Sequence, residues 1–164
     1  MPASGASRED IFLLLDGVKG ESQDAIHEDE IEVVSWSWSI QAKSGEMSAM
    51  RSSPQLHELV IVKNVDKSSP VLRQLLVHAK GPIKTGKLTV RKAGQEALEY
   101  LKLEMESIRV TGVTVHTDGA EHRETVTLSF PKIKMTYLPQ GATGAQGGGA
   151  TQFEYDARQA PARP

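Results

Sequence analysis

The chain of 164 residues contains no cysteine. This absence excludes disulfide bonds, thiol catalysis and metal sites built from cysteine, but it does not identify a compartment. Long hydrophobic runs are also lacking, because the run at 11–15 is too short for a signal-peptide core and far too short to span a membrane. We therefore expect a protein that is not inserted in a membrane, begins in the cytoplasm and, if exported, leaves without a cleaved signal.

An excess of one charge is missing as well. The 19 basic and 21 acidic residues leave a net charge of −2, so a broad attraction to nucleic acid or to an anionic membrane is not expected. The lysines between residues 63 and 92 are offset by acids elsewhere. The charge balance therefore predicts no nucleic-acid partner.

Motifs that support catalysis are also lacking. The histidines have no second histidine at metal-ligand spacing, which predicts a surface or loop position for each: His27, His57, His78, His116 and His122. The acidic run at 28–30, with Glu32, has no calcium-loop glycine and predicts a solvated strand edge. The segment 81–88 has P-loop spacing, but it ends in Leu88 where a hydroxyl is required, and it follows a helix. With no Gly-x-Ser-x-Gly elbow either, we predict no enzyme, and no catalytic, cofactor-binding or metal-binding residues.

What the chain does contain is an alternating tryptophan–serine segment. Trp36 and Trp38 are its only tryptophans, and serines surround them at Ser35, Ser37 and Ser39. Because residues i and i+2 of a strand share a face, one face of a strand at about 30–41 is large and apolar, and the other is small and polar. The apolar phase changes between residues 33 and 34, which predicts a β-bulge there.

Other patterns predict a mainly β protein with one helix. Strands are expected at 11–15 (a short strand buried on both sides, or the start of a strand), 56–65, 87–92, 97–115 with a bend near Gly112, 124–137 with a break at 130–131, and 152–158. The helix is expected after Ser69 as N-cap and before Gly81, with an apolar face of Val71, Leu72, Leu75, Leu76 and Ala79.

This order of elements predicts one domain over residues 1–164, an antiparallel β-barrel or sandwich with a flanking helix. Residues 1–9 are expected to be flexible, and the glycine-rich residues 141–150 to form a linker. The side chains predicted for the core are Trp36, Trp38, Leu75, Leu88, Val90 and Phe130.

The segment 43–54 has no periodic pattern, yet it contains two methionines. They either pack partly on the domain's own surface or contact another subunit, since methionine is enriched at interfaces. The candidate residues for a subunit or ring-stacking interface are Glu46, Met47, Met50 and Arg51.

Polar-faced strands without catalytic groups predict a binding or assembly module, because a small polar face can line a channel or a ligand cavity. Several segments together resemble one protein family in their order and spacing: Gly17–Ser22, Glu28–Ile31, Ser35–Trp38, Val90–Gly94, Glu99–Leu101, Val126–Phe130 and Tyr137–Pro139. They are similar to Hcp, the haemolysin-coregulated protein family of bacterial type VI secretion.

The resemblance implies a β-barrel with a flanking helix that assembles as a homohexameric ring. Rings of this family stack into the tube that is propelled from the cell with the spike protein, inside a contractile sheath, and the ring lumen holds and chaperones small effector proteins. The family is not enzymatic and uses no cofactor. Combined with the alternation, the resemblance implies that Ser35, Ser37 and Ser39 face the lumen. The alternative that stays open is a monomeric ligand-binding β-barrel carrier.

Overall fold

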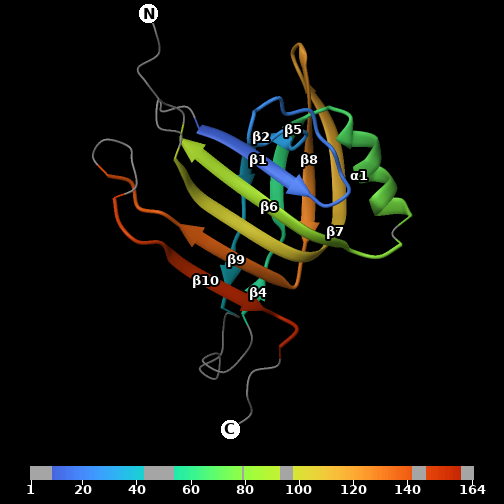
Figure 1. Ribbon diagram of the computed structural model, residues 1–164. Helices are drawn as coiled ribbons and strands as arrows, with labels where there is room; N and C mark the ends of the chain where they lie inside the picture. Colours follow the sequence, from blue (N-terminus) through green and yellow to red (C-terminus); the bar gives the residue numbers. More distant parts are fainter. Residues whose placement is uncertain (1–8, 43–53, 79, 93–97, 142–146, 160–164) are drawn as a thin grey trace, which may run out of the picture.

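The computed structural model describes residues 9–42, 54–78, 80–92, 98–141 and 147–159. Six antiparallel strands close into a barrel in the order β7-β6-β1-β2-β5-β8-β7 (Figure 1). Their bounds are β1 Glu9–Leu15, β2 Ile31–Ser37, β5 Leu59–Asn64, β6 Ile83–Lys92, β7 Glu99–Asp118 and β8 Glu121–Ser129. The expectation of a mainly β barrel with a flanking helix is confirmed.

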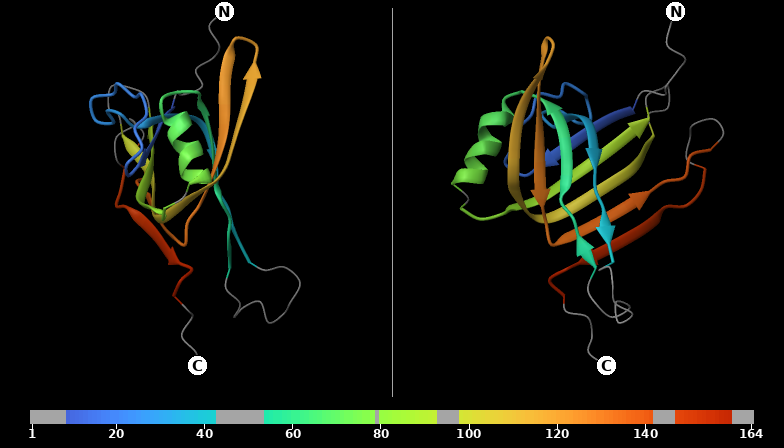
Figure 2. Two further views of the ribbon diagram at one scale, coloured as in Figure 1. Left: turned by 90° about the vertical axis from the view of Figure 1, so that its right-hand side faces the viewer. Right: turned by 180° about the vertical axis from the view of Figure 1, so that it is seen from behind.

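Four shorter strands extend the barrel. β9 (Lys132–Tyr137) pairs with the first half of β7, and β10 (Thr151–Asp156) pairs with β9. β3 (Ile40–Gln41) and β4 (Gln55–Leu56) form a two-stranded ribbon. This ribbon and the β7–β8 hairpin project from opposite ends of the barrel (Figure 2).

The long strand β7 belongs to both sides of the barrel. Its residues up to Ile108 pair with β6, while those from Arg109 onward pair with β8. Ser107, between the two halves, has a φ of 57°. The register then shifts between Val110 and Gly112, which is the bend that the sequence predicts near Gly112.

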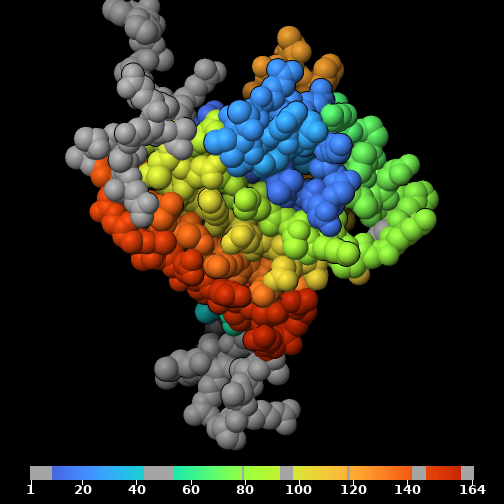
Figure 3. Space-filling model, viewed as in Figure 1, coloured from blue at the N-terminus to red at the C-terminus, as the bar shows by residue number. Residues whose placement is uncertain are grey.

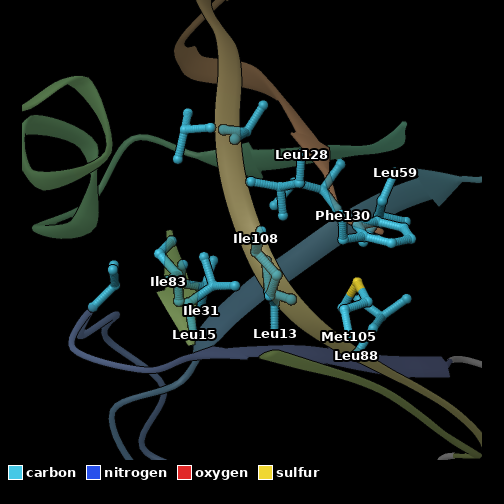
Figure 4. Packing of buried hydrophobic residues seen from close by; sticks show 14 of the residues in the cluster. Leu13, Leu15, Ile31, Leu59, Ile83, Leu88, Met105, Ile108, Leu128 and Phe130 are labelled. Atoms are coloured by element: carbon cyan, nitrogen blue, oxygen red, sulfur yellow. The ribbon is translucent and has the colours of Figure 1, made fainter. Parts of the chain in front are cut away.

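The barrel interior is filled by aliphatic side chains. Leu13, Leu88 and Leu103 are direct cross-strand neighbours on β1, β6 and β7, and all are fully buried. From the opposite wall, the paired residues Ile61 and Val126 are also fully buried. Figure 4 shows the two walls meeting in this core. A packed interior of this kind leaves the outer faces of the sheet for binding.

The helix α1 (Ser68–Val77) lies against the outside of the barrel (Figure 1). It begins earlier than predicted: Lys67 is at the N-cap position, and Ser69 lies inside the helix and is buried. Its apolar face is also narrower than predicted, because only Leu72 is fully buried while Val71 and Leu76 are exposed. Ala79 lies outside the described residues. Among those residues, no helix has the length and apolarity needed to cross a membrane.

Two further sequence predictions concern the C-terminal half. The predicted break at 130–131 separates β8 from β9, and the predicted last strand is β10. Leu88, Val90 and Phe130 are buried, at 0%, 1% and 7% exposure. Residues 1–8 and 142–146 lie outside the described part of the chain, so the flexible N-terminus and the linker remain predictions.

Candidate functional site: a neutral hydroxyl face on the barrel

A β-bulge decides which side chains of β2 point outward. Ile31 and Val33 are buried, and the register with β5 then shifts between Val33 and Ser35, as the sequence predicts. Val34, inside the bulge, is 40% exposed. The extra residue reverses the alternation, so Ser35 and Ser37 are exposed on the outside of the barrel.

The two tryptophans occupy the other side of this strand, but they are not core residues in the sense that the sequence predicts. Trp36 and Trp38 are only partly buried and pack against the edge of the hydrophobic cluster. Leu75 of α1 is likewise only partly buried. The reason for the two tryptophans is their position, since β2 ends at Ser37 and the chain then leaves the barrel towards the β3–β4 ribbon (Figure 2).

Neighbouring strands continue the serine side of β2 into a broad surface. Ser37 is in register with Val60 and then Thr127, and Ser35 with Val62, Thr125 and Thr114. We call this surface the hydroxyl face; it consists of Ser35, Ser37, Val60, Val62, Thr111, Thr114, Thr125 and Thr127. The strands β2, β5 and β8, which carry most of it, lie in front in the right panel of Figure 2. All of these side chains are uncharged.

A hollow of about 450 Å³ opens at the end of the hydroxyl face. Its lining consists of Ser37, Trp38, Ser39, His57, Glu58, Val60 and Thr127. The backbone N–H of His57 donates to the carbonyl of Ser39 at 3.1 Å. This bond joins the segment just before β5 to the segment just after β2 and so holds the two sides of the hollow together.

Among the described residues that line the hollow, Glu58 is the only one with a carboxylate. The hydroxyl of Thr111 donates to its Oε2, and the same hydroxyl lies 2.9 Å from the hydroxyl of Thr127. The hydroxyl face and the hollow are thus connected by hydrogen bonds between neutral groups and one carboxylate.

Not every residue predicted for the site is brought together. Ser35 and Ser37 lie on the hydroxyl face, while Ser39 lies past the end of β2, half-buried at the hollow. The interface candidates Glu46, Met47, Met50 and Arg51 all lie outside the described residues. The threonines of β7 and β8 and Glu58 were missed, although the alternation Thr125-Val126-Thr127-Leu128 contains the same signal as the serines of β2.

Sequence reasoning also missed a buried ionic cluster between the barrel and α1. Lys63 and Glu124, neighbours on β5 and β8, are both fully buried, and their Nζ and Oε1 atoms are 2.5 Å apart. Glu124 also accepts hydrogen bonds from Ser69 at 2.6 Å and Arg73 at 2.9 Å, while Lys63 lies 3.0 Å from Asp66. Burial alone would raise the pKa of Glu124, but these donors lower it below its ordinary value. The cluster fixes the helix to the barrel.

A second polar cluster lies in the segment between β1 and β2. His27 is in this loop, which is one of the two positions predicted for it, but it is buried at 3% exposure. Glu30 is buried at 7% exposure instead of lying at a solvated strand edge. The His27 ring stacks on Phe12 at 4.3 Å, and its two nitrogens lie 2.8 Å from Glu30 and 2.5 Å from Glu99. Burial alone would raise the pKa of Glu99, but the contacts with His27 and Lys102 together lower it below its ordinary value.

This segment covers the upper part of the outer face of β1 and β6 (Figure 3). The sequence contained part of the signal, since β1 is predicted to be buried on both sides. Phe12, on its outer side, is 4% exposed. The prediction is wrong for Leu14, which is 43% exposed because it lies beyond the covered part.

Comparison with known proteins agrees with the fold. Residues 12–137 match the protein family described as "Type VI secretion system effector, Hcp". The chain is 36% identical over 156 residues to "Protein hcp1" of Pseudomonas aeruginosa, covering 92% of this chain and 96% of that protein.

Solved structures give the same result. The crystal structure of Hcp1 from Salmonella typhimurium is similar with a TM-score of 0.77 at 35% identity, over 92% of this chain and 95% of that one. A type VI secretion system effector from Yersinia pestis has a TM-score of 0.73 at 28% identity, over 90% and 99% of the two chains. The family match covers most of the chain, and the chain therefore belongs to the Hcp family of type VI secretion system proteins.

Proposed function

We propose that this protein is a tube subunit whose copies close into a homohexameric ring with the hydroxyl face towards the channel. The single observation that carries the proposal is this face: four adjacent strands present small or neutral side chains outward, in register, on an otherwise charged protein. Hydroxyl groups remain hydrated and offer weak hydrogen bonds to many partners. A channel with this lining suits small effector proteins of varied sequence, which it would hold and chaperone for export.

Ring stacking is the second part of the proposal. The β7–β8 hairpin and the β3–β4 ribbon project at opposite ends of the barrel (Figure 2), which supports contacts between successive rings through these ends. The candidate contact residues Glu46, Met47, Met50 and Arg51 lie in the segment between β3 and β4. In this proposal the stacked rings leave the cell with the spike protein, driven by the sheath, and no cleaved signal is involved.

The alternative function, a monomeric carrier of a small ligand, requires a cavity inside the barrel. The barrel interior is instead occupied by fully buried side chains such as Leu13, Ile61, Leu88 and Val126. Cargo therefore has to bind outside the barrel wall, which supports the ring over the carrier.

Two measurements test the proposal. Native mass spectrometry should give the mass of a closed ring, and negative-stain images should contain annular particles; a monomer in both would refute the assignment. Ser37→Arg should keep the ring mass but lower the amount of effector protein that co-purifies with it. The control is Thr85→Arg, because Thr85 is exposed on β6, in the opposite wall of the barrel. Equal effector recovery for the two variants would refute the position of the hydroxyl face in the channel.

A further inference from the structure

Glu58 is an acidic group on a neutral surface. Among the residues that the structure describes, its carboxylate forms no ion pair, and its one hydrogen bond comes from the hydroxyl of Thr111. On the opposite wall of the barrel, two carboxylates are paired: Lys132 lies 2.7 Å from Glu106 and 3.4 Å from Glu154. Among the described residues, no ion pair therefore balances the Glu58 carboxylate.

The carboxylate is also held in place. Thr111 donates to Oε2, and the Thr111 hydroxyl is itself within 2.9 Å of the Thr127 hydroxyl and 3.1 Å of the Thr127 carbonyl. In the described part of the chain, Oε1 of Glu58 has no hydrogen-bond donor, so it remains available to a ligand. A fixed acceptor of this kind loses little conformational entropy when a partner binds.

The walls of the hollow match a long cationic side chain. Trp38 and Val60 contribute apolar surface, and Ser37 and Thr127 contribute hydroxyls. Lysine and arginine have an apolar stem that packs on such surface and a charged end that seeks a carboxylate. The volume of about 450 Å³ is ample for one such side chain together with the backbone that bears it.

We propose that this hollow binds a lysine or arginine side chain of a polypeptide, with the Glu58 carboxylate as its counter-ion. The inference rests on the proposed function, because only a ring surrounds one channel with several copies of the hollow. A polypeptide with several basic residues then binds several copies at once, and its affinity exceeds that of a single contact. The hydroxyl face holds cargo loosely, and the hollows select cargo with basic segments.

The test uses fluorescence anisotropy with two labelled twelve-residue peptides of glycine and serine, one with three arginines and one with three glutamines in their place. The unmodified protein should bind the arginine peptide and not the glutamine peptide. Glu58→Gln should weaken binding of the arginine peptide about tenfold, because each exposed ion pair contributes a factor of about two to five and several act together. Thr111→Val, which keeps the charge but releases the carboxylate, should give a smaller loss.

The control is Glu104→Gln, which removes the same charge from an exposed position on the first half of β7, in the opposite wall of the barrel. This variant should bind like the unmodified protein, whereas equal losses for Glu58→Gln and Glu104→Gln would reveal a general charge effect and overturn the inference. Unchanged binding by Glu58→Gln, or no binding of the arginine peptide by the unmodified protein, would also overturn it. The mass of each sample is measured first, since monomers would refute the ring, while the Glu58→Gln comparison would still decide whether the hollow binds cations.

Discussion

Replacing Lys63 by methionine should detach α1 from the barrel and destabilise the protein. Lys63 is fully buried, and its Nζ lies 2.5 Å from the equally buried Glu124 carboxylate. Methionine has nearly the same length but no charge, so Glu124 would remain buried without its nearest cation. A helix of ten residues is not stable alone in water, so it depends on this anchor and on Leu72.

The size of the loss follows from the remaining partners. Removing one member of a buried ion pair costs about 3–5 kcal/mol. Glu124 would keep its hydrogen bonds from Ser69 at 2.6 Å and Arg73 at 2.9 Å, which places the expected loss near the lower end, at about 3 kcal/mol. For a domain of this size, that corresponds to a melting temperature lower by about 6–12 °C.

Thermal and urea unfolding, at one fixed protein concentration, measure this loss. Hydrogen exchange should also locate it, with α1 losing protection before the barrel strands. Lys84→Met is the control, because Lys84 is exposed on β6, and its stability should be unchanged. The double variant Lys63→Met/Glu124→Leu should lose far less unfolding free energy than the sum of the losses of the two single variants. Each single variant leaves one buried charge without its partner, whereas the double variant removes both charges.

The pH dependence gives an independent check. Because the folded-state pKa of Glu124 lies below its ordinary value of 4.5, its contribution to stability is complete above that pH and is lost as the pH falls below it. Lys63→Met should reduce this acid-dependent loss. A variant that melts like the unmodified protein, or additive losses in the double variant, would refute the account of the cluster.

Three further predictions concern single positions. Gly20→Ala should cost about 2–3 kcal/mol in unfolding free energy, because a Cβ there would lie 2.5 Å from the Glu30 carbonyl oxygen; an unchanged urea midpoint would contradict this contact. Trp36→Ala should cost about 2 kcal/mol, less than the roughly 3–5 kcal/mol of a fully buried aromatic, and a larger loss in the same assay would show a deeper position. Burial and the hydrogen bond to Glu9 raise the pKa of Tyr100 to about 12 from 10.0, so its contribution to stability is complete below pH 10 and falls as the pH rises towards 12. Ultraviolet titration should find this late-ionising tyrosine in the unmodified protein and not in Tyr100→Phe.

Much of the fold follows from local pattern. The bulge at Val34, the bend near Gly112 and the break between β8 and β9 all agree with phase changes or breakers in the sequence. The helix boundaries were less well predicted, because Ser69 has the residue type of an N-cap but its hydroxyl is used by Glu124. The role of Ser69 was decided by Glu124 on β8, which is distant in sequence, so the local pattern around Ser69 could not predict it.

The candidate site divides in the same way. The outward direction of Ser35 and Ser37 follows from their spacing and the bulge, both local properties. The hollow at Glu58 depends on Thr111 and Thr127, which reach it only through the pairing of β7 with β8 and of β8 with β5. For this reason sequence reasoning found the serines and missed the carboxylate.

By itself the sequence determined which faces of the strands are apolar and which are polar, because side chains alternate with a period of two that is visible along the chain. It also determined the family, through motifs kept in order along most of its length. The tertiary structure alone decided that Lys63 and His27 are buried and that Glu58 stands in a neutral hollow. Each of these depends on contacts between segments far apart in sequence, such as the 61 residues that separate Lys63 from Glu124, and such contacts exist only once the barrel has closed.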